Sequence, residues 1–341
     1  MPTVLKTSFW NYDRTIPLMD GRVKIEGYKL AVDINRPEIS FGEAFEQAKY
    51  DVTEVSFSNT VTAVSRREDF PYALIPAFPS RAFRHSAIFV RTDRGISKPE
   101  DLRGKIVGLQ EYDMTAAVVV RGFLRDHCGV DPRDIRWRVG EIERTKPLEF
   151  PLGRPPAGVE IEILGPDRSL EDRLLAGELD AVITLRALAA YRTGDPRIAS
   201  LFPDPIAAEK AWFVAAKHFP IMHAVGIKKS FLVRDSRLAR RLFDAFLAAK
   251  DIAVAELEIT QAPKVTLPGL TPPWPRPAPY WGLTTGHMGL RRTAASWRRN
   301  CVGRSSTGCR RAQSRWRSCS RRIASILEQI GSCVRASAAA I

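Results

Sequence analysis

The chain has 341 residues, which is long enough for two domains with sizeable cores. Its formal net charge is +14, but 13 arginines, no lysine and one acid lie after residue 268. Residues 1–268 hold 39 basic and 37 acidic side chains, so the excess charge belongs to the tail. This distribution argues against nucleic acid as a partner of the body and predicts a nearly neutral globular protein.

The cysteines and the N-terminal residues indicate the cellular compartment of the protein and whether a metal site is expected. Cys128 is the only cysteine before residue 269, which fits a reducing compartment. The tail cysteines form no paired C-x-x-C pattern, so no metal site is predicted. The N-terminus lacks the pattern of a signal peptide, and no apolar run approaches the ~20 residues of a membrane span. We therefore expect a cytoplasmic protein without a membrane partner.

The first part of the chain alternates strands with a helix. Ser40 is a predicted helix N-cap, and Glu43 would complete a capping box. Because ligand sites of α/β proteins lie at the carboxyl ends of strands, Arg14, Glu54 and Ser56 are candidate substrate-binding residues. The expected elements are strands at residues 4–9, 27–34 and 51–56 and a helix at residues 40–48.

A basic stretch follows, between two apolar runs. Arg81, Arg84 and His85 directly precede an apolar, β-branched run that begins near residue 86 and reads as a buried strand. Guanidinium groups match carboxylates bidentately, so Arg81 and Arg84, together with Arg14, are predicted to hold a small carboxylate-bearing molecule. Two solvated or salt-bridged surface arginines beside a turn histidine are an equal alternative.

A strand ending at residue 109 leads through a polar loop into a predicted helix at residues 115–126. The first amide groups of a helix have no partner inside it, so its N-terminus can bind an anion. Glu111, Tyr112 and Thr115 lie at this point and are candidate site residues. Capping of the helix is the alternative role for Glu111.

The rest of the body continues the alternation, which predicts an α/β fold with a mostly parallel sheet. Arg186 follows a strand and is a candidate binding residue, with a purely structural role as its alternative. Asp13 could serve only to orient Arg14, and His223 is interpreted as a hydrogen-bonded core histidine rather than a catalyst. The expected elements are strands at residues 135–139, 159–164, 180–184 and 219–227 and helices at residues 169–177 and 236–257, with a proline-rich excursion at residues 147–156.

No nucleotide-binding, zinc-protease or serine-hydrolase motif is present in the sequence. Several short sequence segments, taken together, instead resemble those of one protein family. Over residues 3–268 the chain resembles 4,5-dihydroxyphthalate decarboxylase and its relatives, which share the fold of type II periplasmic solute-binding proteins. The segments that carry this resemblance are Tyr12-Asp-Arg-Thr15, Phe78-Pro-Ser-Arg-Ala-Phe-Arg-His85, Gly108-Leu-Gln-Glu-Tyr-Asp-Met-Thr115, Gly177-Glu-Leu-Asp-Ala-Val-Ile183 and Phe219-Pro-Ile-Met-His223.

The resemblance implies an α/β fold of two lobes, with mostly parallel sheets and a central cleft, the second lobe being inserted into the first. On this basis residues 1–85 are the first part of lobe 1, residues 86–200 are lobe 2, and residues 201–268 return to lobe 1. The resemblance also implies a carboxy-lyase that converts 4,5-dihydroxyphthalate to 3,4-dihydroxybenzoate and CO2. The chemistry of such a ring needs no organic cofactor in principle, so none is expected. A small aromatic carboxylate would be its substrate, and a homo-oligomer is a further expectation.

The roles of single residues follow from chemistry and position rather than from the family. Decarboxylation of a catechol-type ring needs cations for two carboxylates, an acid for the ring carbon and partners for two hydroxyls. His85 is the predicted proton donor, because imidazole titrates near working pH. Glu54, Glu111 and Tyr112 would meet the hydroxyls, and Arg186 would reach in on closure.

The remaining hypotheses concern the C-terminal tail and alternative functions of the protein. Residues 269–341 show no sustained period and read as an out-of-frame, disordered segment, with a base slip near Pro268 as the hypothesis. A basic nucleic-acid arm is the less favoured alternative for this tail. A solute-binding protein that delivers an aromatic acid or a thiamine-precursor-like ligand to an ABC transporter is the alternative function. An inactive product of the base slip is a third hypothesis.

Overall fold

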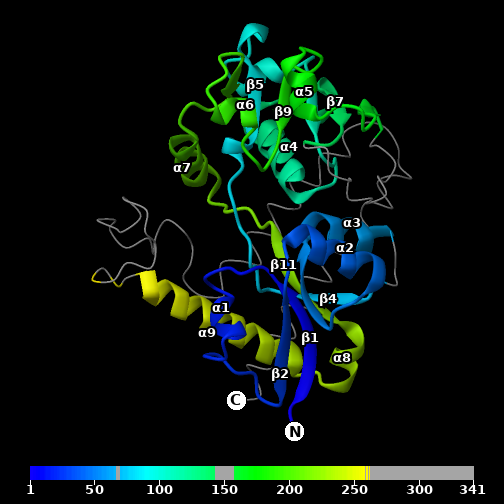
Figure 1. The fold of residues 1–341 in the computed structure, drawn as a ribbon, viewed down its shortest axis with the longest axis vertical. Helices are drawn as coiled ribbons and strands as arrows, with labels where there is room; N and C mark the ends of the chain where they lie inside the picture. The colour runs from blue at the N-terminus through cyan, green and yellow to red at the C-terminus, as the bar shows by residue number, and fades with distance from the viewer. Residues whose placement is uncertain (67–69, 143–156, 258, 260, 262–341) are drawn as a thin grey trace. The chain divides into compact units, whose positions relative to one another are not determined.

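The chain divides into two compact units (Figure 1). Of the described residues, those in Met1–Arg81 and in 221–261 belong to unit 1, and those in Ala82–Pro220 belong to unit 2. The predicted frame slip, the basic tail and the proline-rich excursion lie outside the described residues. The computed structural model describes residues 1–66, 70–142, 157–257, 259 and 261.

Unit 1 is built on a five-stranded sheet in the order β2-β1-β3-β11-β4. β1 is parallel to β2 and β3, whereas β11 is antiparallel to β3 and β4. The strands are β1 (Thr3–Phe9), β2 (Tyr28–Ile34), β3 (Val52–Ser56), β4 (Tyr72–Ile75) and β11 (His223–Lys228). The helices are α1 (Ile16–Met19), α2 (Pro37–Gln47), α3 (Phe57–Arg66), α8 (Lys229–Arg234) and α9 (Leu238–Leu257).

Helices cover both faces of the unit 1 sheet. α9 buries an apolar stripe at helical spacing, and Phe246 on this helix packs edge-on against Phe9, with ring centroids 5.3 Å apart. Val52 joins that cluster, whereas Val55 packs with residues of α2 and α3. Because residues three apart on a strand point to opposite faces, α9 lies on one face and α2 and α3 lie on the other.

Unit 2 is built on a six-stranded sheet in the order β10-β5-β9-β6-β7-β8. Its strands are β5 (Ile88–Arg91), β6 (Ile106–Leu109), β7 (Arg136–Val139), β8 (Ile161–Ile163), β9 (Ala181–Ile183) and β10 (Ile198–Ser200). Its helices are α4 (Thr115–Cys128), α5 (Leu170–Leu175), α6 (Ala189–Arg192) and α7 (Pro205–Ala216). Its short 3₁₀ helices are η1 (His85–Ala87), η2 (Thr92–Arg94), η3 (Pro99–Leu102) and η4 (Pro132–Asp134).

The core of unit 2 lies where α4 packs on β6 and β7. Trp137 and Leu109 are fully buried there, together with the apolar face of α4. α4 ends at Gly129, whose backbone φ of 65° is left-handed and whose amide closes the last turn by donating to the carbonyl of Leu124. The core therefore fixes the start of α4 beside the end of β6.

The predicted α/β class is confirmed, with two differences in detail. Each sheet is mixed rather than mostly parallel, because β11 in unit 1 and β5 in unit 2 run against their neighbours. The predicted capping role of Ser40 is wrong, because α2 begins at Pro37. Proline at the first helical position has a suitable φ and needs no amide partner. Ser40 is instead buried, with its hydroxyl 2.7 Å from that of Ser8.

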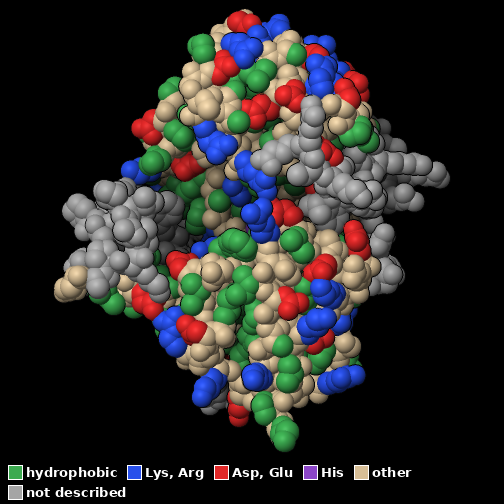
Figure 2. All heavy atoms as spheres, viewed as in Figure 1, with side chains coloured by type: hydrophobic (Ala, Val, Ile, Leu, Met, Phe, Trp, Pro, Cys, Tyr) green, Lys and Arg blue, Asp and Glu red, His purple; other side chains and the backbone are tan. Residues whose placement is uncertain are grey.

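Charged side chains of both signs are interspersed on the described surface. Acidic side chains lie among basic ones on the face that Figure 2 draws. Pairs such as Arg197 with Asp195, 2.6 Å apart, and Arg240 with Asp244, 2.7 Å apart, neutralise one another. This agrees with the nearly neutral body expected from the sequence.

Candidate functional site

Three segments of unit 1 meet at one edge of its sheet. The carboxyl ends of β1 and β3 lie at this edge because the two strands are parallel, and β11 begins there because His223 pairs with Ser56. The loop after β1 is folded by Thr15, whose hydroxyl donates to the carbonyl of Trp10 and accepts from the amide of Tyr12. Polar side chains from residues far apart in sequence are thus brought together.

A hydrogen-bonded group of Tyr12, Glu54 and His223 lies at this edge. Glu54 is opposite Val225 in the β3–β11 register, so Glu54 and His223 point to the same face of the sheet. The Oε1 atom of Glu54 is 2.5 Å from Nδ1 of His223 and accepts a hydrogen bond of 2.9 Å from the hydroxyl of Tyr12. We call these three residues the acid group.

The acid group has a buried end and an accessible end. Glu54 is fully buried, and its Oε2 atom also accepts from the backbone amide of Trp10 at 3.3 Å. The side chain of His223 is 17% exposed, and its ring stands edge-on to Phe41 with centroids 4.9 Å apart. Since Glu54 engages Nδ1, Nε2 is the ring nitrogen on the side away from the carboxylate.

Burial keeps Tyr12 protonated. Desolvation raises the pKa of Tyr12 well above its ordinary value, and the charge of Glu54 adds to the rise. The charge of Arg14 and a hydrogen bond from the Ser80 side chain act in the opposite direction. Tyr12 is therefore a hydrogen-bond donor to Glu54 over the whole physiological range.

Two of the predicted cations belong to the same unit. Arg14 stacks over the Tyr12 ring, 4.1 Å from its centroid, and pairs with Asp13 at 2.9 Å, in keeping with the orienting role considered for Asp13. Arg81 forms an antiparallel bridge with Ile221 and is partly buried. Burial lowers the pKa of Arg81 to about 10, so an anion beside it would offset part of its desolvation cost.

The remaining predicted residue of unit 1 is Ser56. It ends β3, is 4% exposed, and its carbonyl accepts from the hydroxyl of Thr60 at 2.7 Å. The structure therefore brings Glu54 and Ser56 to the same sheet edge as His223. It also joins Arg14 to Glu54 through Tyr12.

A second group of predicted residues lies at one edge of the unit 2 sheet. Ile183, the last residue of β9, pairs with the first residue of β5 and the last residue of β6. The loops that follow β6 and β9 therefore lie beside η1, and the amide of Thr184 donates to the carbonyl of Ala87 at 2.9 Å. Arg186 is exposed, and its amide donates to the hydroxyl of Thr184 at 3.1 Å.

Tyr112 and Thr115 are more buried than a substrate contact requires. Tyr112 is 3% exposed, with its ring edge-on to Trp137 at 5.8 Å and the guanidinium carbon of Arg121 3.6 Å from its centroid. Thr115 is the first residue of α4 and is 5% exposed, while Glu111 is partly buried in the loop before it. Tyr112 thus packs into the core of unit 2.

His85 lies inside an aromatic cluster. Its ring stacks on Phe123 with centroids 4.6 Å apart, and Phe202 and Trp212 approach it edge-on. Burial, aided by the charge of His127, lowers the pKa of His85 to about 4. A neutral, buried imidazole is a poor proton donor at neutral pH, so these surroundings disfavour the predicted catalytic role.

Arg84 precedes the aromatic cluster around His85, and its charge influences the pKa of Glu209. The positive charge of Arg84 lowers the pKa of Glu209, although desolvation outweighs it and the net shift is upward. The carboxyl group of Glu209 also accepts a hydrogen bond from the backbone of Ser86. Arg84 is therefore engaged within unit 2.

The surroundings of His85 predict an acid-sensitive fold. Unfolded histidine binds a proton near pH 6.5, whereas buried His85 does so only near pH 4. The unfolded state therefore binds more protons between these values, and the free energy of unfolding falls as the pH falls through this window. The full difference between the pKa values of His85 in the unfolded and folded protein corresponds to roughly 3 kcal/mol of unfolding free energy.

We expect His85→Phe to remove this part of the acid sensitivity while retaining the aromatic packing. Urea denaturation of both proteins at pH 7 and pH 5 measures it. The wild type should lose more unfolding free energy than the variant between the two pH values. Equal losses in the two proteins would show that His85 is protonated in the native state.

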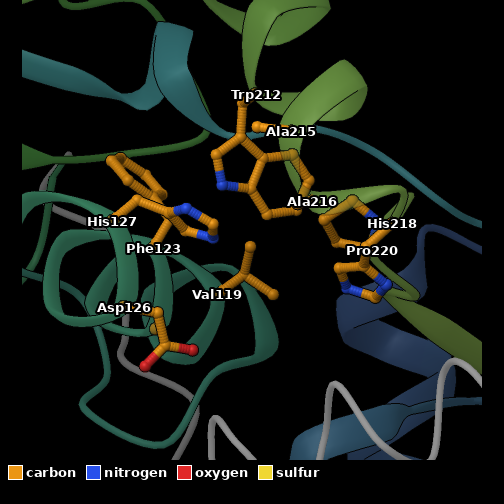
Figure 3. A pocket seen from close by; sticks show the side chains of 10 residues that line it. Val119, Phe123, Asp126, His127, Trp212, Ala215, Ala216, His218 and Pro220 are labelled. Carbon is orange, nitrogen blue, oxygen red and sulfur yellow. The ribbon is translucent and has the colours of Figure 1, made fainter.

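A pocket of about 360 Å³ opens in unit 2 between α4 and the segment from α7 to Pro220 (Figure 3). The Trp212 ring stands edge-on to His127 and to His218, at 5.6 Å from each, and Asp126 lies on the same wall as His127. None of the predicted site residues lines this pocket.

Sequence reasoning did not single out Tyr12 and did not identify the partner of His223. The structure places His223 in a strand and in a hydrogen bond, as expected, with Glu54 as the partner and with 17% of the side chain exposed. The available signal was the strand-end position of Tyr12 beside Arg14. No comparable signal existed for His223, because its partner is 169 residues away.

Two kinds of feature are absent from the described parts of the chain, a cluster of metal-binding side chains and a helix that could cross a membrane. No group of three or more His, Cys, Asp or Glu side chains there is arranged to hold a metal ion. No helix among the described residues has the length and apolar character needed to cross a membrane.

The chain matches one family model and solved structures of low sequence identity. A family model described as an ABC transporter phosphonate periplasmic substrate-binding protein matches residues 30–184. Among solved structures, the periplasmic aliphatic sulphonate binding protein of Escherichia coli is 13% identical, with a TM-score of 0.46 over 94% of this chain and 91% of that chain.

Two curated relatives are much more similar in sequence. The 4,5-dihydroxyphthalate decarboxylase of Comamonas testosteroni is 40% identical over 264 residues, which are 77% of this chain and 80% of the relative. The 4,5-dihydroxyphthalate decarboxylase of Pseudomonas putida is 39% identical over 214 residues, which are 63% of this chain and 83% of the relative. With this identity over most of both chains, the protein belongs to the 4,5-dihydroxyphthalate decarboxylase family.

Proposed function

We propose that the protein is a carboxy-lyase that converts 4,5-dihydroxyphthalate to 3,4-dihydroxybenzoate and CO2. The observation that carries the proposal is the buried Glu54 carboxylate paired with the partly exposed His223, in a chain whose curated relatives bear this enzyme's name. Such a pair supplies the one group that the reaction needs most, a proton donor for a ring carbon.

In the proposed reaction, protonated His223 donates from Nε2 to the ring carbon that carries the departing carboxylate. The bond between that carbon and the carboxylate then breaks, its electron pair returns to the ring, and CO2 leaves. One proton is consumed for each CO2 released, and the imidazole is reprotonated from water. The hydroxyl para to the reacting carbon spreads the positive charge of the intermediate, so no electron acceptor is required.

Glu54 is proposed to orient the imidazole and to stabilise its charged form. Its position resembles the carboxylate of a catalytic triad, which holds a histidine by Nδ1 and leaves Nε2 for the reaction. Tyr12 and the amide of Trp10 satisfy other acceptor positions of Glu54, which holds this buried side chain in place.

Arg14 and Arg81 are proposed to hold the substrate carboxylates. Arg14 already touches the acid group through the Tyr12 ring, and the lowered pKa of Arg81 shows the desolvation that an anion would relieve. Ser56, Arg84, Glu111, Tyr112, Thr115 and Arg186 stay predictions as substrate contacts. The cytoplasmic location and a homo-oligomer also stay predictions.

The test is to incubate the purified protein with 4,5-dihydroxyphthalate in D2O and follow both products. We expect one CO2 for each 3,4-dihydroxybenzoate, with one deuterium at the vacated ring carbon. Phthalate, which lacks both hydroxyls, is the matched control and should not react. Tight binding of 4,5-dihydroxyphthalate without CO2 release would overturn the proposal and favour a solute-binding protein.

A further inference from the structure

The pocket in unit 2 has the size of a small-ligand site. Its volume is about 360 Å³, and it lies between α4 and the segment from α7 to Pro220 (Figure 3). Ligand pockets in proteins span roughly 300–1,000 Å³, and a cavity of about 150 Å³ is enough for a benzene molecule. The pocket can therefore hold one aromatic ring with a substituent.

The walls of the pocket are largely apolar and aromatic. Val119 and Phe123 contribute from α4, Ala216 from the last turn of α7, and Pro220 from the segment that follows. The indole of Trp212 lines the pocket as well. A flat apolar ring would bury its surface against these side chains, which favours binding of an aromatic compound.

The pocket contains a buried donor without an acceptor. The Nε1 atom of Trp212 is buried and donates to no atom of the described residues. The imidazoles of His85, His127 and His218 stand edge-on to the indole, yet none of them accepts from it. Figure 3 shows the indole nitrogen on the edge of the ring that lies toward His127.

This donor indicates what a ligand must carry. Buried tryptophan N–H groups usually have a hydrogen-bond partner, because an unmade hydrogen bond is costly away from water. An N–H directed at an aromatic ring gains much less than one directed at an oxygen. A ligand with an oxygen acceptor beside Nε1 of Trp212 would therefore be favoured over a plain hydrocarbon.

The charge of the pocket narrows the class of ligand further. Asp126 is the only Asp, Glu, Lys or Arg among the described residues that line it. An aromatic acid would lack a permanent counter-charge there and would be repelled by Asp126. A cation would be attracted by Asp126 but could not accept from the indole. A phenolic hydroxyl is uncharged below about pH 10 and can both accept and donate a hydrogen bond.

We propose that this pocket is a binding site for an uncharged phenol, a single aromatic ring whose hydroxyl oxygen accepts from Nε1 of Trp212. The site is distinct from the one proposed for decarboxylation, because its residues belong to unit 2 and the acid group belongs to unit 1. Binding here requires no turnover, so the proposal stands or falls independently of the proposed function.

The test is a titration of the full-length protein, labelled with ¹⁵N-tryptophan, with phenol at pH 7. The indole resonance of Trp212, identified by its absence from Trp212→Phe, should shift and saturate. Benzoate and benzylammonium carry opposite charges on the same ring and should cause no saturable shift. A resonance that phenol leaves unmoved, or that either ion moves as strongly, would overturn the proposal.

Calorimetry of Trp212→Phe measures the hydrogen bond itself. Phenol should bind this variant about fivefold to tenfold more weakly than the wild type, the effect of one lost hydrogen bond. Benzene, which lacks the hydroxyl, should bind both proteins equally, because phenylalanine retains an aromatic wall. Equal affinity of phenol for both proteins would exclude Trp212 as the donor.

Two alanine variants of α7 separate the pocket from the rest of the fold. Ala216→Leu enlarges a wall of the pocket and should weaken phenol binding at least tenfold. Ala211→Leu makes the same change at an exposed position of the same helix that does not line the pocket, and it should bind phenol as the wild type does. Urea denaturation shows whether both variants are folded. Wild-type affinity in folded Ala216→Leu would place phenol elsewhere and overturn the proposal.

Discussion

His223→Gln is expected to lower kcat by roughly 10²- to 10⁴-fold, the usual contribution of a positioned general acid. Glutamine keeps a polar side chain of similar reach but cannot deliver a proton to carbon. Substrate binding should change little, because the cations proposed to hold the carboxylates remain. Steady-state release of CO2 from 4,5-dihydroxyphthalate measures the effect.

The matched control for this variant is His127→Gln, which changes an exposed histidine of α4 in unit 2. It should retain wild-type kcat. Glu54→Gln should lower kcat by a similar factor to His223→Gln, and the double variant should be little worse, because the two residues act as one unit. A kcat for His223→Gln within threefold of the wild type would remove His223 as the proton donor.

Arg81→Ala is expected to lower kcat/KM by about 10²-fold, within the range found when one partner of a close charged pair is removed. The guanidinium of Arg81 is partly buried, so its attraction for a carboxylate is weakly screened. Arg81→Lys should recover only part of the loss, because an ammonium group cannot bind a carboxylate bidentately.

The control for Arg81→Ala is Arg240→Ala, which removes an arginine of α9 that pairs with Asp244. Its kcat/KM should equal that of the wild type. Arg81→Ala should weaken the binding of 4,5-dihydroxyphthalate, which carries two carboxylates. It should weaken inhibition by 3,4-dihydroxybenzoate, which carries only one carboxylate, to a smaller extent. Full activity of Arg81→Ala would exclude Arg81 as a residue that holds a substrate carboxylate.

The sequence predicted single residues of the candidate site better than the way in which the fold brings these residues together. Glu54 and Ser56 could be identified because the end of a parallel strand is where ligands bind, and Arg14 because it follows the first strand. His223 could not, because its role depends on β11 entering between β3 and β4 in one register. A shift of one residue would turn His223 to the opposite face of the sheet.

Two other differences between the prediction and the structure have separate causes. His85 carries the right chemistry for a proton donor, but the rings of Phe123, Phe202 and Trp212 surround it, and sequence spacing does not reveal such a cluster. α7 was not expected, because its residues are apolar on nearly all sides and show no helical period. Tertiary packing set the surroundings of His85, whereas α7 has no buried residue and begins with a local signal, the Asp204 carboxylate that accepts from the amide of Ala207 at 2.9 Å.

The place of β11 in the unit 1 sheet has a consequence for biosynthesis. As the chain leaves the ribosome, β3 has no partner on one side and β4 has no sheet to join until residue 228 has been made. Unit 2, whose described residues all lie within Ala82–Pro220, can fold during this interval. The nascent chain meanwhile exposes a strand edge that invites aggregation, and the step that closes this edge also brings His223 to Glu54.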